Sequence, residues 1–332
     1  MRIALDAMGT DHAPRSEVSG ALGALRELES DIEIVLVGDR TTLESELAAH
    51  DDYPRDRLHI HHAPDRVLAG DPPATVLRRK PHSSIVVGLK LQKDGEADAF
   101  ISAGSTGAVM AASLFVLRPL PGVERPSVAT FLPTRSEPAL LLDAGTNVDC
   151  KPRHLVQFAH LGHIYVQDVL GVERPRIGLL NIGEEPEKGD ERAVETFRLL
   201  SSEAGLHFVG NVEGREVVEG RCDVLVADGF VGNVLLKFYE SVAQFIVGLM
   251  QRELKRSDLE MDMQNIFRVL DYSEYGGAPL LGVNGVTIIC HGGSPPKAIR
   301  NAVRVAAQAV RSGMVRDMAT ELAQGGAAQE AG

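Results

Sequence analysis

The chain has 332 residues, which is enough for two domains or for one large α/β unit. Apolar residues make up 44% of the sequence and charged residues 24%, which is ordinary for a soluble globular protein. The formal net charge of −12 argues against a nucleic-acid-binding surface and against a membrane binder that is cationic overall.

The N-terminus and the cysteines indicate a cytoplasmic protein. The apolar start MRIALDAMG is too short for a signal peptide, and an acidic residue follows at once. Cys150, Cys222 and Cys290 lie far apart and form no CxxC pair, which argues against a zinc ribbon. Each lies in or beside an apolar run. We therefore expect three small buried thiols in a reducing compartment.

Strand-like and helix-like runs alternate along the chain. The expected strands are Arg2–Asp6, Ile34–Gly38, Leu58–Ala63, Ala99–Ala103, Val128–Leu132, Ala139–Asp143, Ile177–Ile182, His207–Gly210, Val224–Ala227 and Val286–Cys290. The expected helices are Arg15–Leu28, Thr41–His50, Ile85–Lys93, Ala108–Leu117, Pro152–Leu170, Glu191–Ala204, Val234–Lys255 and Pro296–Ser312. This alternation predicts a three-layer α/β/α fold with a mostly parallel sheet.

A Pro-rich stretch, Arg118–Pro126, predicts a boundary between two α/β lobes with a cleft between them. We expect residues 1–125 to form the first lobe, with a C-terminal helix at 296–320 returning to pack on it. Residues 126–295 would form the second lobe, including a helical hairpin at 234–270. The small-residue tail within 321–332 is expected to be flexible.

Several familiar motifs are absent from the sequence. It contains no GxxxxGK[ST] phosphate loop, no GxGxxG dinucleotide fingerprint and no GxSxG nucleophile elbow. These absences argue against an ordinary P-loop enzyme and against a serine hydrolase, and they weaken a dinucleotide-binding interpretation.

The turn AGSTGA joins an apolar strand to an apolar helix. Small residues let backbone N–H groups approach a ligand, and a helix N-terminus carries roughly half a positive charge. Ser105 and Thr106 add hydroxyl donors, so we predict that this turn binds phosphate. A purely structural N-cap is the alternative.

Polar residues also follow other expected strands. They occur in ALDAMGTDHAP near the N-terminus, in RIGLLNIGEEPEKGD, in ADGFVGNVLLK and in VTIICHGGSPPK. Ligands of open α/β sheets bind outside the carboxyl ends of strands, so these loops are candidate site segments. His59 and His61 share one face of a strand, but no acid or cysteine nearby in sequence completes a metal site. We therefore predict no metal.

Taken in order, these segments resemble the PlsX family of phosphate acyltransferases. The matching segments include ALDAMGTDHAP, RRKPHSS, ISAGSTGA, LLLDAGTNVDCKP, GLLNIGEEPEKG and VADGFVGNVLLK, and they span residues 2 to about 312. The family usually has Gly where this chain has Thr10, and Asn where it has Ser105.

The resemblance implies an enzyme of bacterial phospholipid synthesis. Inorganic phosphate would attack the thioester of a fatty acyl carrier protein and give an acyl phosphate, without a cofactor. The product would feed a membrane acyltransferase that acylates glycerol 3-phosphate. The resemblance also implies a homodimer and a fold like those of phosphotransacetylases and isocitrate-type dehydrogenases.

Roles for individual residues follow from loop position and from this reaction. We expect Ser105, Thr106 and Gly107 to bind phosphate, with Lys188 as a cationic partner. Candidates for polarising the carbonyl are Asn181, Asn233 and His291, and Asp228 and Asp143 would orient those groups. The basic triplet Arg78, Arg79 and Lys80 could dock the acidic carrier protein, or it could be solvated loop charge.

Two α/β-enzyme alternatives and one non-enzymatic alternative remain open. A phosphotransacetylase would share the phosphate site but accept short acyl-CoA, a dehydrogenase would need a dinucleotide site, and a non-catalytic scaffold would only recruit lipid enzymes. The hairpin at 234–270 has more apolar surface than one packed face needs, so we expect a four-helix contact between two subunits. A hairpin buried within its own lobe is the alternative. Acidic residues at its tip predict weak or indirect membrane contact.

Overall fold

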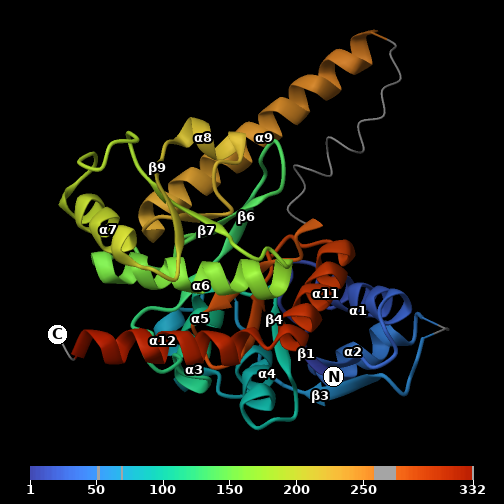
Figure 1. The fold of residues 1–332 in the computed structure, drawn as a ribbon. Coiled ribbons are helices and arrows are strands. Elements are labelled where there is room, and N and C mark those ends of the chain that lie inside the picture. Colours follow the sequence, from blue (N-terminus) through green and yellow to red (C-terminus); the bar gives the residue numbers. More distant parts are fainter. Residues whose placement is uncertain (51–52, 69, 258–273, 331–332) are drawn as a thin grey trace. The chain divides into compact units, whose positions relative to one another are not determined.

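The computed structural model describes residues 1–50, 53–68, 70–257 and 274–330, and the chain forms two units (Figure 1). Unit 1 comprises Met1–Pro126 and Tyr275–Gly332, and unit 2 comprises Ser127–Glu274. The predicted α/β class is confirmed, because sheets of mostly parallel strands alternate with helices along the chain.

The seven-stranded sheet has the order β3-β2-β1-β4-β12-β11-β5, and all of its strands except β5 belong to unit 1. Neighbours from β3 to β12 pair in parallel, and β11 is antiparallel to β12. The parallel strands are rich in buried Ile, Leu, Val and Phe, as expected for strands covered on both faces. Their bounds are Arg2–Asp6 (β1), Glu33–Gly38 (β2), Leu58–His62 (β3), Ala99–Ser102 (β4), Ser127–Val128 (β5), Ala278–Leu281 (β11) and Val286–Ile289 (β12).

The helices of unit 1 come from both ends of the chain. Gly20 lets α1 and α11 approach closely, because a Cβ at this position would lie 2.6 Å from the Cβ of Ile299. The C-terminal helix α11 therefore packs on the first helix of the protein. The helices are Arg15–Glu27 (α1), Arg40–Leu47 (α2), Pro73–Arg79 (α3), Ser84–Lys93 (α4), Thr106–Val116 (α5), Pro296–Ser312 (α11) and Met314–Glu330 (α12).

Unit 2 is built on a smaller sheet with the order β6-β7-β10-β8-β9. Only β6 is antiparallel to its neighbour, and the β7, β10, β8 and β9 pairs are parallel. The strands are Thr130–Leu132 (β6), Ala139–Leu142 (β7), Arg176–Leu180 (β8), His207–Val212 (β9) and Val224–Val226 (β10). The helices are Pro152–Leu170 (α6), Glu191–Ser202 (α7), Gly214–Glu219 (α8) and Gly229–Ser257 (α9).

The structure corrects several expectations. Residues 275–295, which we assigned to the second lobe, belong to unit 1, because β12 pairs with β4. The run Val128–Leu132 is two strands, β5 and β6, in different sheets. The segment expected to be a flexible tail continues α12 as far as Glu330. The sequence analysis did not predict β11, α3 or α8, because these elements are short and show no clear periodicity of apolar residues.

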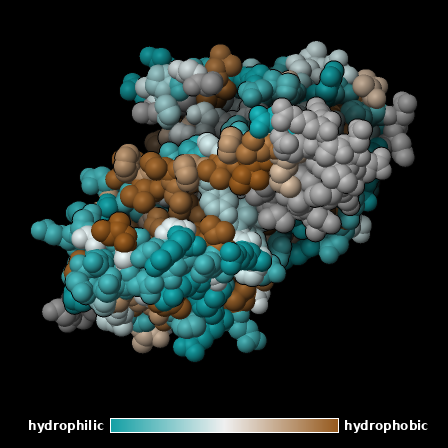
Figure 2. All heavy atoms as spheres, turned by 90° about the horizontal axis from the view of Figure 1, so that it is seen from above, coloured by the Kyte–Doolittle hydropathy of each residue, from teal (hydrophilic) through white to brown (hydrophobic). Residues whose placement is uncertain are grey.

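Helix α9 carries most of the exposed apolar surface of unit 2. The structure describes α9 as far as Ser257, and the expected break at 257–258 and the second helix of the predicted hairpin reach outside the described residues. Gly229–Arg252 is long and apolar enough to cross a membrane by length and composition alone. Its exposed apolar residues include Phe230, Val234, Phe238, Phe245 and Ile246. Hydrophobic side chains gather on the face seen in Figure 2.

A buried carboxyl group lies under the loop that follows β1. Glu17 has no exposed surface, and it accepts hydrogen bonds from the backbone N–H of Thr10 at 2.7 Å and from its hydroxyl at 2.9 Å. Burial raises the pKa of Glu17 from 4.5 to about 7, because the charged form loses its hydration. Folding therefore favours the protonated, neutral form of the Glu17 carboxyl group.

We expect Glu17→Gln to remove a pH dependence of stability. A group with a raised folded-state pKa stabilises the fold below its unfolded pKa, and this contribution is lost as the pH rises through about 7. Relative to the unaltered chain, the variant should gain about 1–3 kcal/mol of unfolding free energy between roughly pH 5 and pH 8. Urea unfolding at each pH measures this difference in unfolding free energy. Glu44→Gln, at an exposed position, is the control. A difference that does not vary with pH would contradict the assignment.

Candidate active site

Three loops meet at the carboxyl ends of β1, β4 and β12, which are neighbouring parallel strands of unit 1. A Cβ at Gly9 would lie 2.7 Å from the backbone nitrogen of Gly104, so only glycine lets the first two loops touch. The backbone N–H of Asp11 donates to the carbonyl oxygen of Gly292 at 2.8 Å. The loops therefore form one continuous surface.

The predicted phosphate loop is held from below by a buried carboxyl group. The hydroxyl of Ser102 donates to Asp6 at 2.6 Å, and the backbone N–H of Gly104 donates to the same hydroxyl oxygen at 3.0 Å. Burial raises the pKa of Asp6. Asp6 and Ser102 shape the loop through these buried hydrogen bonds.

Ser105 is the N-cap residue of α5, but its side chain makes no capping hydrogen bond. Thr106 is exposed, and Gly107 is partly exposed at the first turn. The first backbone N–H groups of a helix have no partner within the helix, so an anion can complete them. The structure therefore does not show the Ser105 side-chain cap that was the alternative for AGSTGA, and anion binding stays a prediction.

The basic triplet lies at the end of α3, a helix whose first residue contacts this loop. A Cβ at Gly107 would come within 2.9 Å of the Pro73 side chain, which places the start of α3 against the start of α5. Arg78 and Arg79 are exposed at the end of α3. Lys80 instead pairs with Asp71 at 2.5 Å and donates to the carbonyl oxygen of Arg66 at 2.8 Å. Two arginines of the triplet therefore remain exposed on the surface, and Lys80 holds a loop.

His291 follows β12 and is exposed in unit 1, not in the second lobe to which we assigned it. Its Nδ1 accepts a hydrogen bond from the backbone N–H of Gly293 at 3.2 Å. Asp11 and His12, on the neighbouring loop, are also exposed. Within the described residues, no group of three or more His, Cys, Asp or Glu side chains is arranged to hold a metal ion.

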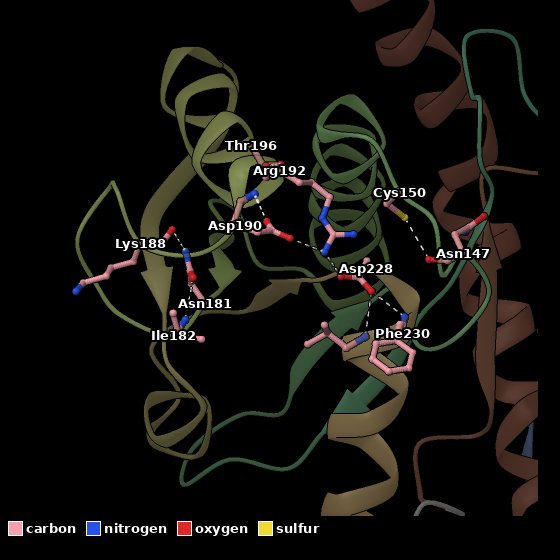
Figure 3. A network of polar contacts seen from close by, with 12 residues as sticks. Asn147, Cys150, Asn181, Ile182, Lys188, Asp190, Arg192, Thr196, Asp228 and Phe230 are labelled. Atoms are coloured by element: carbon pink, nitrogen blue, oxygen red, sulfur yellow. Dashed lines mark hydrogen bonds and ion pairs between the residues drawn. The ribbon is translucent and has the colours of Figure 1, made fainter.

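A second set of polar residues follows β7, β10 and β8, which are neighbouring parallel strands of unit 2 (Figure 3). Asn181 begins the loop after β8. Its amide N–H donates to the carbonyl oxygen of Lys188 at 3.0 Å, and its amide oxygen accepts from the backbone N–H of Ile182 at 2.8 Å. Because the amide has two N–H donors, one remains for a ligand.

Lys188 lies at the far side of the same loop and is exposed. Figure 3 shows its side chain directed away from Asp228 and from Arg192. The cation that the loop and α7 bring to this edge of the sheet is Arg192, which our sequence analysis did not select. Its position two residues after the N-cap Asp190 is the only sequence signal that pointed to it.

Asp228 combines a helix cap with an ion pair. One carboxylate oxygen accepts from the backbone N–H groups of Phe230 and Val231, at 2.9 and 3.0 Å, at the start of α9. The other oxygen lies 2.8 Å from the Arg192 guanidinium, which also lies 3.4 Å from Asp190. Asp228 is only 5% exposed, so this pair is shielded from water on the carboxylate side. It fixes Arg192 against the start of α9.

Asp143 and Asn233 lie around the loop after β7. Asp143 is fully buried and accepts hydrogen bonds from the backbone of Thr146 and Asn147 and from the Asn147 amide. Burial raises the pKa of Asp143. Asn233 is exposed on the first turns of α9, and its side chain covers Gly145. These contacts join the β7 loop to the start of α9.

A cavity of about 520 Å³ opens beside this second set. Asn181, Asp190, Arg192 and Asp228 line it together with apolar side chains of α6, β8, α7 and α9. The cavity therefore has one polar region and mostly apolar walls.

The cysteines match the sequence expectation. Cys150, Cys222 and Cys290 are all buried. Burial raises the pKa of Cys150 to about 11 and those of Cys222 and Cys290 to about 12. None of the three presents a thiolate near neutral pH.

Comparison with known proteins identifies relatives along nearly the whole chain. A family model described as "Fatty acid synthesis protein" matches residues 1–317. The chain is 50% identical to a phosphate acyltransferase from Heliobacterium modesticaldum over 95% of this chain and 96% of the relative. It is 48% identical to a phosphate acyltransferase from Desulforamulus reducens over 95% of each chain.

The fold also resembles that of solved phosphotransacetylases. One from Streptococcus pyogenes aligns with a TM-score of 0.63 at 17% identity, covering 94% of each chain. At this identity the likeness concerns the fold, and the expected relation to phosphotransacetylases is confirmed at that level. The full-length sequence matches are what decide the family: this chain belongs to the fatty acid synthesis protein family, whose members include the phosphate acyltransferases that its sequence resembles.

Proposed function

We propose that this chain transfers a fatty acyl group from an acyl carrier protein to inorganic phosphate. The observation that carries the proposal is a sequence similarity. The chain is 50% identical to a phosphate acyltransferase over 95% of its length. The loops of unit 1 supply a candidate anion site, and unit 2 supplies a candidate site for the acyl group. The acyl phosphate product would serve bacterial phospholipid synthesis.

The reaction needs neither a cofactor nor a protein nucleophile. Phosphate near neutral pH is substantially dianionic, so one of its oxygens can attack the thioester carbonyl carbon directly. The tetrahedral intermediate then breaks its C–S bond and releases the carrier thiolate, which takes a proton, since thiol pKa values are about 8.5. The three buried cysteines offer no competing thiolate.

The enzyme's contribution is then to position the reactants and to stabilise the oxyanion. Proximity contributes about 7–11 kcal/mol and an oxyanion donor about 2.7–4 kcal/mol. We assign phosphate to Ser105, Thr106 and Gly107, whose helix terminus is open. For the carbonyl oxygen, the candidates are Asn181, Asn233 and His291. Asp228 and Asp143 position the start of α9, and we add Arg192 as a cation of this group.

The proposed docking surface for the carrier protein is Arg78 and Arg79. Carrier proteins of this type are acidic, and this chain itself carries −12, so binding needs local positive charge. The two arginines are exposed on α3, whose first residue contacts the phosphate loop helix. A carrier bound there would deliver its thioester near the proposed phosphate site.

Two further partners stay predictions. The exposed apolar side chains of α9 fit a contact with a second subunit, as a homodimer would need. They also fit weak or indirect contact with a membrane, where the downstream acyltransferase would take the product. Two measurements separate these partners: light scattering reports dimers, and vesicle flotation reports lipid binding.

The activity itself is tested by mixing the protein with palmitoyl carrier protein and phosphate and trapping acyl phosphate with hydroxylamine. We expect phosphate-dependent acyl phosphate formation, with much lower activity on acetyl-CoA. A preference for acetyl-CoA would support the phosphotransacetylase alternative instead. Absence of any thioester cleavage that depends on phosphate would contradict the proposed function and favour the scaffold alternative.

Replacing both hydroxyls of the phosphate loop should weaken phosphate binding. For Ser105→Ala with Thr106→Ala we expect the KM for phosphate to rise at least about fivefold, because each neutral hydrogen bond contributes about 0.5–1.5 kcal/mol. Folding should be unaffected, since the Ser105 side chain makes no capping bond and Thr106 is exposed. Thr320→Ala, an exposed hydroxyl on α12, is the control. An unchanged phosphate KM would overturn the assignment.

Reversing the charge of the exposed arginines should weaken carrier binding. We expect Arg78→Glu with Arg79→Glu to raise the KM for palmitoyl carrier protein about tenfold or more and to flatten its salt dependence. Activity on a short acyl-pantetheine thioester should change little. The matched control is Arg118→Glu with Arg125→Glu, two exposed arginines of the same unit. Equal loss on both substrates would mean that Arg78 and Arg79 serve the fold or the chemistry.

A further inference from the structure

The cavity of unit 2 is built from buried and exposed apolar side chains together. Leu155 of α6 and Leu179 of β8 are 3% and 2% exposed, so they belong to the core and form a fixed floor. Val234 and Phe238 of α9 also line the cavity and are 55% and 67% exposed. The cavity therefore has a rigid inner wall and an outer wall open to solvent.

One face of α9 forms that outer wall. Val231, Val234, Leu235 and Phe238 are spaced three, one and three residues apart, which places them on one side of a helix. Asp228, at the N-cap of this helix, lies at the same end as Arg192 and Asn181. Apolar side chains thus extend from a single polar end along the helix axis.

We propose that this cavity binds the fatty acyl chain, with the thioester at the Asn181, Arg192 and Asp228 end and the hydrocarbon along α9. The inference rests on the proposed function and adds the location of the acyl chain. The volume of about 520 Å³ lies within the ~300–1,000 Å³ typical of small-molecule sites. A ligand with one polar head and one apolar tail matches walls that are polar at one end only.

A second subunit or a lipid surface could also cover exposed apolar residues of α9. Either would contact the outward side chains of the helix, such as Phe245, which lies outside the cavity lining. Neither accounts for a cavity that is also lined by the core residues Leu155 and Leu179. The acyl chain accounts for the recessed floor.

Filling the cavity should change the preference for chain length. Each methylene that enters an apolar cavity should raise kcat/KM roughly fourfold, which corresponds to about 0.8 kcal/mol. Val234→Trp should therefore lower kcat/KM for palmitoyl carrier protein at least about tenfold relative to octanoyl carrier protein. Val242→Trp, on the same helix but outside the cavity lining, is the matched control and should leave the palmitoyl to octanoyl ratio unchanged.

Direct binding can be read by fluorescence, because the chain contains no tryptophan. Phe238→Trp places a single tryptophan in the cavity wall, and Phe245→Trp places one on the same helix outside it. A brominated palmitate quenches tryptophan only at contact range. We expect saturable quenching of Phe238→Trp and little quenching of Phe245→Trp.

The outcomes separate the two proposals. If the unaltered chain makes acyl phosphate but Val234→Trp lowers palmitoyl and octanoyl activity equally, the acyl-chain site is wrong while the proposed function stands. Equal quenching of both tryptophans, or a change of oligomeric state by light scattering with Val234→Trp, would also overturn the site. If no acyl thioester of any length yields acyl phosphate, the proposed function itself fails, whatever the quenching shows.

Discussion

Parallel pairing of neighbouring strands is the constraint on which both clusters of candidate residues depend. Parallel strands end at the same edge of a sheet, so residues distant in sequence become neighbours there. In unit 1 the pairing of β1, β4 and β12 brings together loops that are separated by almost two hundred residues between Ser102 and His291. In unit 2 the pairing of β7, β10 and β8 does the same for Asp143, Asp228 and Asn181.

Buried carboxyl groups hold these loops in shape. Asp6, Asp143 and Asp228 each accept hydrogen bonds from backbone or side-chain donors of an adjoining loop or helix. A buried carboxyl group is costly unless it is hydrogen-bonded or neutralised, which is why each is either surrounded by donors or paired with Arg192. Because these carboxyl groups form their hydrogen bonds and ion pairs within the protein, we assign them a positioning role.

Each unit carries one kind of candidate surface. The loops of unit 1 have an open helix terminus and exposed arginines, which suit an anion and an acidic carrier. Unit 2 has an apolar cavity with a polar end, which suits an acyl group. The three cysteines are buried, and direct attack by phosphate on a thioester needs no thiolate of the protein.

The sequence by itself determined the fold class, the family and most of the elements. Apolar periodicity located nearly every long helix and strand, and the segments ISAGSTGA and VADGFVGNVLLK carried the resemblance that the comparisons confirm. Only the tertiary structure decided that His291 belongs to unit 1, that Lys80 is held by Asp71, and that Arg192 joins Asp228. These are consequences of strand pairing and of ion pairs between distant elements, and local sequence patterns carry no information about which strand pairs with which. The apolar cavity is also decided by the tertiary structure alone. Its walls come from α6, β8, α7 and α9, and they form a cavity only when those elements pack together.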